Sequence, residues 1–275
     1  VIGTEISQLR KDFGKTTVLG RRRTEIGNPP FDVVIPLEAM VEREPITVVC
    51  SEKGWIRAMK GHLSDDTELK FKDGDGARFL LRAETTDRIL VFATDGRFYT
   101  LQADKLPRGR GHGEPLRLMI DLANDQDLVT LEIHRPDKRF LVASDDGRGF
   151  VANSTDVVAQ TRSGRQVMNL AHGAMATICI AAQGDMVAVV GTNRKLLIFK
   201  LEEIPELARG KGVILQRYKD GKLAALKVFN AEAGISWHMN GGRKRTETDL
   251  ATWVGKRASA GKQPPIGFPR PPRFT

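Results

Sequence analysis

Short apolar runs occur in pairs along most of the chain, and a polar turn separates the two members of each pair. The turns are rich in Gly, Asp and Asn, the residues that best tolerate the positive φ of tight hairpin turns. Each pair therefore predicts a β-hairpin. The five predicted hairpins cover residues 46–59, 89–102, 140–153, 187–200 and 235–248.

The predicted hairpins repeat at a nearly constant interval. With the residue after each turn as a marker, successive hairpins are 42, 51, 46 and 49 residues apart; the markers are Trp55, Arg97, Arg148, Arg194 and Arg243. Strand-rich repeats of about 40–50 residues are typical of propeller-like arrays, and one hairpin cannot bury its apolar face alone. The pattern predicts an all-β fold, a five-bladed, propeller-like β-pinwheel over residues 29–262.

The two ends of the chain depart from this pattern. Near the start, apolar residues recur at helical spacing: Ile2, Ile6, Leu9 and Phe13. Residues 1–28 are therefore predicted to hold the end of a short helix and a connector. Because the sequence starts at a valine partway through this helix, we expect a fragment of a longer chain. Residues 263–275 contain five prolines and are predicted to form a disordered tail.

The chain is basic, and its charge is unevenly distributed. It carries 43 Lys and Arg against 34 Asp and Glu, a formal net charge of +9 with a pI near 9.7. Residues 1–26 contribute +3 and residues 241–275 contribute +6, so the middle is neutral overall. A basic excess favours a polyanionic partner. If the middle binds one, its basic residues must gather on one surface.

A basic loop that contains glycine follows each of the last four hairpins, at residues 108–111, 162–165, 209–212 and 255–257. Equivalent loops of similar blades lie on the same rim, so these loops would form a belt. Arg and Lys neutralise phosphates and release counterions, and Gly lets a loop backbone approach closely. One such loop alone is better interpreted as a solvated turn. Four in register favour duplex DNA, held without direct sequence readout.

The candidate DNA-binding residues are basic side chains of these loops and of the hairpins beside them: Arg57, Lys60, Arg108, Arg110, Arg117, Arg148, Arg162, Arg165, Arg194, Lys195, Arg209, Lys211, Arg243, Lys244, Arg245, Lys256 and Arg257. No catalytic set and no metal site is predicted. The five histidines lack metal-ligand spacing. Tyr218 follows an arginine but lies in a predicted strand that runs into a turn, so we predict no catalytic role for it.

Cys50 and Cys179 lie within apolar runs and are interpreted as buried, reduced thiols. No segment approaches the roughly 18 consecutive apolar residues of a membrane span, and no secretory signal is evident. We therefore predict a cytoplasmic protein without a membrane partner.

Several motifs resemble the C-terminal domain of the A subunit of bacterial topoisomerase IV. They are Glu52-Lys53-Gly54-Trp55-Ile56-Arg57, Lys60-Gly61-His62 and residues 69–75 of the first repeat, Asp95-Gly96-Arg97 and residues 110–116 of the second, residues 143–151 of the third, Gly210-Lys211-Gly212 and Arg243-Lys244-Arg245. The related domain of the gyrase A subunit usually has six repeats and carries a Gln-Arg-Arg-Gly-Gly-Lys-Gly box after its first hairpin. Residues 60–75 contain no such box, so the resemblance favours topoisomerase IV.

This resemblance implies a non-catalytic domain that binds and bends duplex DNA and guides DNA segments for decatenation and relaxation. It implies no cofactor in this fragment, with Mg²⁺ and ATP used elsewhere in an ATP-dependent type IIA topoisomerase. It also implies a missing N-terminal cleavage domain that binds the topoisomerase IV B subunit, a condensin as a further partner, and a nucleoid-associated location. The alternatives are the wrapping domain of the gyrase A subunit and a protein-interaction propeller that docks a chromosome-organising partner.

Overall fold

The computed structural model describes residues 2–21, 41–64, 67–109, 111–239 and 242–275. The chain forms two units, residues 1–40 and 41–275. In the first unit, helix α1 spans Ile2–Phe13 at the predicted place. The apolar stripe of α1 is exposed, from 50% at Ile6 to 74% at Ile2. The predicted connector lies outside the described residues from residue 22 onward.

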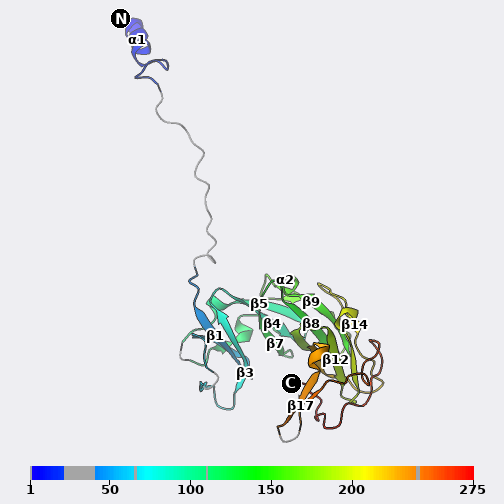
Figure 1. Ribbon diagram of the computed structural model, residues 1–275. Helices are drawn as coiled ribbons and strands as arrows, with labels where there is room; N and C mark the ends of the chain where they lie inside the picture. Colours follow the sequence, from blue (N-terminus) through cyan, green and yellow to red (C-terminus); the bar gives the residue numbers. More distant parts are fainter. Residues whose placement is uncertain (1, 22–40, 65–66, 110, 240–241) are drawn as a thin grey trace. The chain divides into compact units, whose positions relative to one another are not determined.

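The second unit contains five antiparallel sheets within its described residues, which confirms the all-β prediction (Figure 1). We call these sheets blades 1 to 5. Blade 1 holds β1 (Pro45–Ser51), β2 (Trp55–Lys60), β3 (Ala77–Glu84) and β6 (Glu114–Pro115), and blade 2 holds β4 (Arg88–Ala93), β5 (Arg97–Gln102), β7 (Leu128–Ile133) and β10 (Arg165–Gln166). Blade 3 holds β8 (Arg139–Ser144), β9 (Arg148–Asn153), β11 (Ala176–Ala181) and β14 (Val213–Ile214).

Blade 4 holds β12 (Met186–Gly191), β13 (Leu196–Lys200) and β15 (Leu223–Phe229), and blade 5 holds β16 (Ile235–His238) and β17 (Lys244–Glu247). The short helices between strands are η2 (Ala103–Lys105), η3 (Leu116–Leu118), α2 (Ser154–Val157), η4 (Leu201–Glu203) and η5 (Ala231–Ala233). The five hairpins predicted from the pattern are therefore the hairpins of the five blades.

Successive blades pack face to face, and this explains the continuous apolar runs of the hairpin strands. In β4, Ile89 and Val91 join a core shared with blade 1, whereas Leu90 and Phe92 join a core shared with blade 3. A strand buried on both faces needs apolar residues at consecutive positions, not at alternate ones. Two further cores join blade 3 to blade 4 and blade 4 to blade 5.

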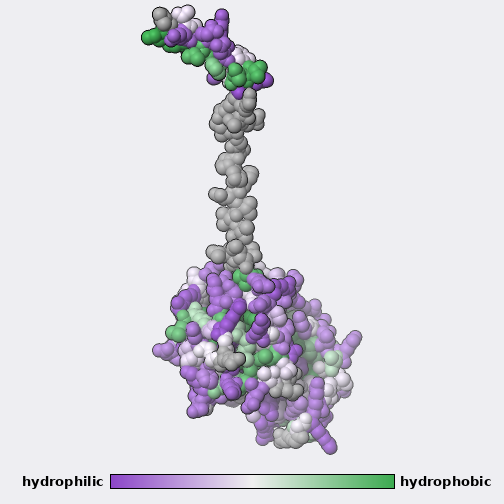
Figure 2. All heavy atoms as spheres, turned by 90° about the vertical axis from the view of Figure 1, so that its left-hand side faces the viewer, coloured by the Kyte–Doolittle hydropathy of each residue, from purple (hydrophilic) through white to green (hydrophobic). Residues whose placement is uncertain are grey.

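The blades form an open arc. The four cores join consecutive blades, and among the described residues none joins blade 5 to blade 1. Figure 1 shows the sheets following one another from β1 to β17. Figure 2 shows the second unit from the β1–β3 side of Figure 1, where hydrophilic residues cover most of the surface. Such a surface fits an end of the arc that no further sheet covers.

Segments of one repeat complete the sheet of the preceding one. The edge strands β6, β10 and β14 pair with β2, β5 and β9, although each follows the hairpin of the next blade in the chain. Leu196 and Ile198 of β13 bridge Lys262 and Val254 in the same way. Backbone hydrogen bonds therefore join each later repeat to the preceding one, and they set the spacing of the blades.

One marker of the sequence register was wrong by one residue. The structure places Arg194 inside the hairpin turn of blade 4, with φ of +59°, at the position held by glycine in Gly96 and Gly147. Lys195 is the residue that follows the turn, since Leu196 pairs with Val190 as Phe98 pairs with Phe92. A three-residue Thr-Asn-Arg turn looks ambiguous in sequence because it lacks the glycine that marks the other turns.

The predicted disordered tail is instead packed on blade 5. Phe268 is 4% exposed and its ring centroid lies 5.3 Å from that of Trp237. The amide of Thr275 donates to the main-chain oxygen of Ser236 at 3.0 Å, on the side of β16 away from β17. The many prolines suggested disorder. Instead, two aromatic residues, Phe268 and Phe274, cover apolar surface that a two-stranded sheet would leave exposed.

Candidate nucleic-acid interface

Four glycines dock the basic loops onto the preceding blade. Gly113, Gly164, Gly212 and Gly261 have φ between +69° and +86°, and a Cβ atom at any of them would lie within 2.8 Å of a neighbouring atom. Only glycine fits such a close approach at positive φ. The sequence interpretation assigned loop glycines to close approach of DNA. For the two of these four that lie in the predicted loops, Gly164 and Gly212, the structure supplies a packing reason instead.

The loops before the first three of these glycines carry exposed basic residues. The exposed Arg, Lys and His side chains described in them are Arg108, His112, Arg162, Arg209 and Lys211, and exposed Arg165 follows Gly164 directly. Arg110 lies outside the described residues. Because each loop ends at an equivalent docked glycine, these charges occupy similar places on successive blades. The predicted regular placement of the basic loops therefore has a structural cause: β6, β10 and β14, next to these loops, pair with the preceding blade.

The fourth loop differs from its sequence interpretation. Gly255 does not dock like Gly212: its amide donates to the oxygen of Ile198, and the docked glycine is Gly261. Lys256 is exposed, but Arg257 is half-buried and its Nη1 donates to the oxygen of Ile214 at 2.6 Å. Arg257 was predicted to contact DNA, but its guanidinium instead binds a main-chain oxygen.

Lys262 was missed by the sequence interpretation. It is exposed and directly follows docked Gly261, as Arg165 follows docked Gly164. The signal that could have found it was the glycine–basic pair itself, which the proline-rich surroundings of residues 261–265 hid.

Arg57 is buried, which contradicts its predicted contact with phosphate. It is 5% exposed, and its Nη1 and Nη2 donate to the oxygens of Gly111 and Lys70 at 2.5 and 2.8 Å. The guanidinium also lies 5.6 Å from the ring centroid of Phe71. Arg57 therefore joins the segment after the first hairpin to the first basic loop. Sequence reasoning could not see this because both partners are backbone atoms distant along the chain.

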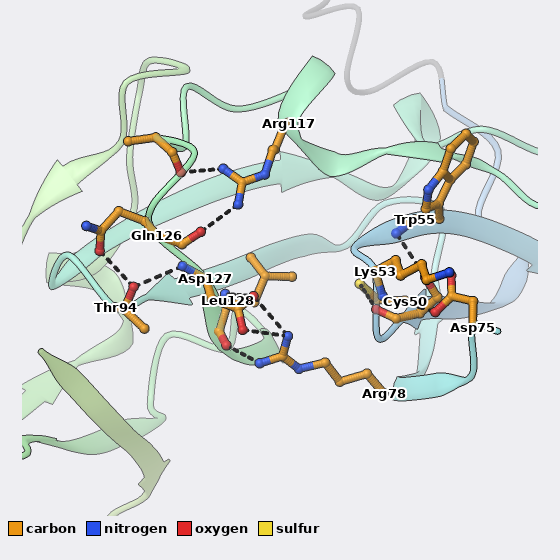
Figure 3. Close-up of polar contacts among 12 residues, drawn as sticks. Cys50, Lys53, Trp55, Asp75, Arg78, Thr94, Arg117, Gln126, Asp127 and Leu128 are labelled. Carbon is orange, nitrogen blue, oxygen red and sulfur yellow. Dashed lines mark hydrogen bonds and ion pairs between the residues drawn. The ribbon is translucent and has the colours of Figure 1, made fainter.

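Arg117 is exposed but its guanidinium is occupied by backbone oxygens. It donates to the oxygen of Gln126 at 2.6 Å (Figure 3), to that of Leu122 at 3.0 Å, and also to that of Ala123. Nearby, Arg78 contacts the carboxylate of Asp127 at 3.0 Å. Arg117 therefore holds together the loop before β7, which is a structural role.

Three more predicted residues contact main-chain oxygens. Arg148, Arg194 and Arg245 donate to the oxygens of Gly212, Phe268 and Ile266 at 3.4, 3.4 and 3.0 Å. All three are half-buried. By contrast, the predicted residues Lys60, Lys195, Arg243 and Lys244 are exposed. Arg162 does both, since it is exposed and its Nη2 donates to the oxygen of Leu118 at 2.5 Å. The predicted set thus contains side chains that hold loops, side chains that face solvent, and a few, such as Arg117 and Arg162, that do both.

Tyr218 has a packing role. A Cβ atom at Gly147 or Gly191 would lie only 2.6 or 2.5 Å from a carbon of the Tyr218 ring. The ring therefore fills the space above two hairpin turns. Burial raises the pKa of the Tyr218 hydroxyl above its ordinary value, and no described group hydrogen-bonds to it. Tyr99 donates to Asp95 at 2.9 Å. Burial, followed by the charge of Asp95, raises the pKa of Tyr99.

Both cysteines are buried thiols without a disulfide. Burial raises the pKa of Cys50 to about 12. Over the described part of the chain, no group of three or more His, Cys, Asp or Glu side chains is arranged to hold a metal ion. None of the described helices has the length and apolar character needed to cross a membrane.

Comparison with known proteins agrees with this architecture. The family described as DNA gyrase C-terminal domain, beta-propeller, matches residues 87–135, 138–172 and 185–230. The A subunit of DNA topoisomerase 4 from Rickettsia bellii is 43% identical over this whole chain, and that from Caulobacter vibrioides is 47% identical over 90% of it. The chain spans 37% and 32% of the lengths of these two relatives.

A solved structure, that of the E. coli ParC C-terminal domain, has the same fold. It superposes with a TM-score of 0.73 at 27% sequence identity, covering 81% of this chain and 95% of that one. The sequence relatives, the family match and this superposition agree with the resemblance seen in the repeat motifs. The chain therefore belongs to the family of DNA gyrase C-terminal β-propeller domains, in the branch formed by the A subunits of topoisomerase IV.

Proposed function

We propose that this domain binds duplex DNA without catalysing a reaction and guides DNA segments for decatenation and relaxation by a type IIA topoisomerase. The observation that carries the proposal is the recurrence of exposed basic residues beside docked glycines on successive blades. A row of such charges matches the recurring phosphates of a duplex, since each neutralised phosphate releases counterions. An arc of blades would favour a bent duplex, at an elastic cost of order 1–6 kcal/mol for a 40–90° bend.

Salt-dependent binding of a short linear duplex to the 275-residue chain tests the proposal. At about 50 mM salt the chain should bind, and log K should fall linearly with log salt, with a slope near −0.9 for each neutralised phosphate. No binding under these conditions would contradict the proposal. A slope near zero would contradict the electrostatic mechanism.

A charge-reversal variant tests the location of the surface. Arg108, Arg110, Arg209 and Lys211 changed together to Glu should weaken binding without lowering the melting temperature. The matched control reverses the same number of exposed charges elsewhere, at Lys11, Lys15, Arg270 and Arg273. Equal losses in both variants would mean that binding follows net charge and not the loops.

The wider assembly stays a prediction for this chain, which matches about a third of its relatives' length. The B subunit as a partner, ATP and Mg²⁺ used elsewhere in the holoenzyme, a condensin partner and a nucleoid-associated cytoplasmic location all belong to the whole protein. The loop variant above separates a DNA role from a protein-docking role. A docking partner that still binds that variant after nuclease treatment would use a different surface.

A further inference from the structure

The Asp-Gly-Arg turns of blades 2 and 3 make the same set of contacts. In blade 2, the amide of Arg97 donates to Asp95 Oδ1 at 2.9 Å, and its Nε lies 3.8 Å from Asp95 Oδ2. In blade 3, the amide of Arg148 donates to Asp146 Oδ1 at 3.3 Å, and its Nε lies 3.9 Å from Asp146 Oδ2. The turn aspartate therefore orients the arginine in both blades.

The far end of each arginine reaches a basic loop. Arg97 Nη1 donates to the main-chain oxygen of Ser163 at 3.1 Å, and Arg148 Nη1 donates to that of Gly212 at 3.4 Å. Ser163 precedes docked Gly164, and Gly212 is itself the docked glycine. Each arginine thus ties a loop of the following repeat to the turn of its own blade.

The loops docked on blades 1 and 4 are held at the same part by different side chains. In blade 1, Arg57 Nη1 donates to the oxygen of Gly111, two residues before docked Gly113. On blade 4 a lysine follows the turn, and Gln216, between β14 and β15, takes the role instead: its Nε2 donates to the oxygen of Ala260 at 2.9 Å, next to docked Gly261. Three different local arrangements, one of them used twice, therefore reach one result, a side-chain donor on a carbonyl within two residues of the docked glycine.

A fixed carbonyl matters because the loop charges are long, flexible side chains on an exposed backbone. Holding the backbone reduces the entropy lost when those charges line up on phosphates, which is the effect of preorganisation. Arginine suits this task, since its planar guanidinium can meet the aspartate and the loop oxygen at once. Lysine keeps the charge, but its three N–H donors all lie on one nitrogen, so it cannot span the aspartate and the loop oxygen in the same way.

We propose that Arg97 and Arg148 are positioning residues of the duplex-binding surface, which act by holding the oxygens of Ser163 and Gly212 and not by contacting phosphate. This inference rests on the proposed function. The competing interpretation is that both arginines contact phosphate directly, since the side chain of Arg97 is 39% exposed. A substitution that keeps the charge separates the two.

The test compares Arg97→Lys with Arg270→Lys in the 275-residue chain. Arg97 holds a basic loop, whereas exposed Arg270 lies outside the basic loops, so the two changes are matched in chemistry. Arg97→Lys should weaken duplex binding about fivefold, the equivalent of one hydrogen bond. Arg270→Lys should stay within about twofold, because it keeps the charge and releases no loop. Arg148→Lys repeats the test on the loop that ends at Gly212.

Hydrogen exchange without DNA gives a second measurement. The amides of residues 161–167 should exchange faster in Arg97→Lys and at the wild-type rate in Arg270→Lys, with both melting temperatures near wild type. Wild-type binding and exchange in both Arg97→Lys and Arg148→Lys would overturn the inference and leave the proposed function standing. Faster exchange with unchanged binding would also overturn it, since the contacts of Arg97 and Arg148 with the loop oxygens would then serve the fold and not DNA binding. A wild-type chain that does not bind the duplex would overturn the proposed function itself.

Discussion

The indole nitrogen of Trp237 donates a hydrogen bond to the main-chain oxygen of Gly267, with the two atoms 3.1 Å apart. The bond joins the buried face of blade 5 to the segment that was expected to be a disordered tail. Phe268, next in the chain, completes the core shared by blades 4 and 5. The last residues are therefore part of the fifth blade.

Phe268→Ala should lower the free energy of unfolding by about 3 kcal/mol, because it removes a buried aromatic ring and leaves a cavity. Denaturant unfolding followed by tryptophan fluorescence measures the loss. The matched control is Ile266→Ala, two residues away and 89% exposed, which should change stability by less than about 0.5 kcal/mol. Equal effects of the two changes would show that the segment does not pack as described.

The docked glycines should be far less tolerant than the other loop glycines. Gly164→Ala places a Cβ 2.8 Å from the ring of Tyr99 at a φ of +70°, so we expect a loss of about 2 kcal/mol or more. Gly111→Ala meets no atom within 4 Å and should be nearly neutral. Thermal melting of the two variants decides the point, and a stable Gly164→Ala would refute the docking geometry.

The two tyrosines should respond in opposite ways to loss of the hydroxyl. Tyr99→Phe removes the 2.9 Å hydrogen bond to Asp95 and should cost about 1 kcal/mol of stability. The hydroxyl of Tyr218 is buried, and no described group hydrogen-bonds to it. Tyr218→Phe should therefore be neutral or stabilising by up to about 1 kcal/mol. Chemical denaturation of both variants checks this, and a clear loss in Tyr218→Phe would reveal a missing partner.

Substitution of a buried basic residue should lower stability, whereas substitution of an exposed one should change the salt dependence of duplex binding. Arg57→Gln leaves the oxygens of Gly111 and Lys70 without their donor and should cost about 2 kcal/mol of stability. Lys211→Gln should leave stability unchanged and make the salt slope of duplex binding shallower by about 0.9. An unaltered slope in Lys211→Gln would remove this lysine from the binding surface.

The sequence by itself determined the architecture of this protein. Pairs of apolar runs around turns rich in Gly, Asp and Asn specify hairpins through local backbone preferences, and their regular spacing implied an array of blades. These signals are local, so they can be read without knowing which segments meet. The same holds for α1, whose apolar spacing appears in the first residues.

Only the tertiary structure decided which basic residues face solvent. Arg57 and Arg165 look alike in sequence, yet one is buried on two main-chain oxygens and the other is exposed beside a docked glycine. The difference arises from strand exchange, since β6 and β10 bring loops onto blades that precede them by many residues. The packed C-terminal segment has the same cause. Its partner, Trp237, is distant in the chain, and burial of their aromatic surface outweighs the proline-rich composition.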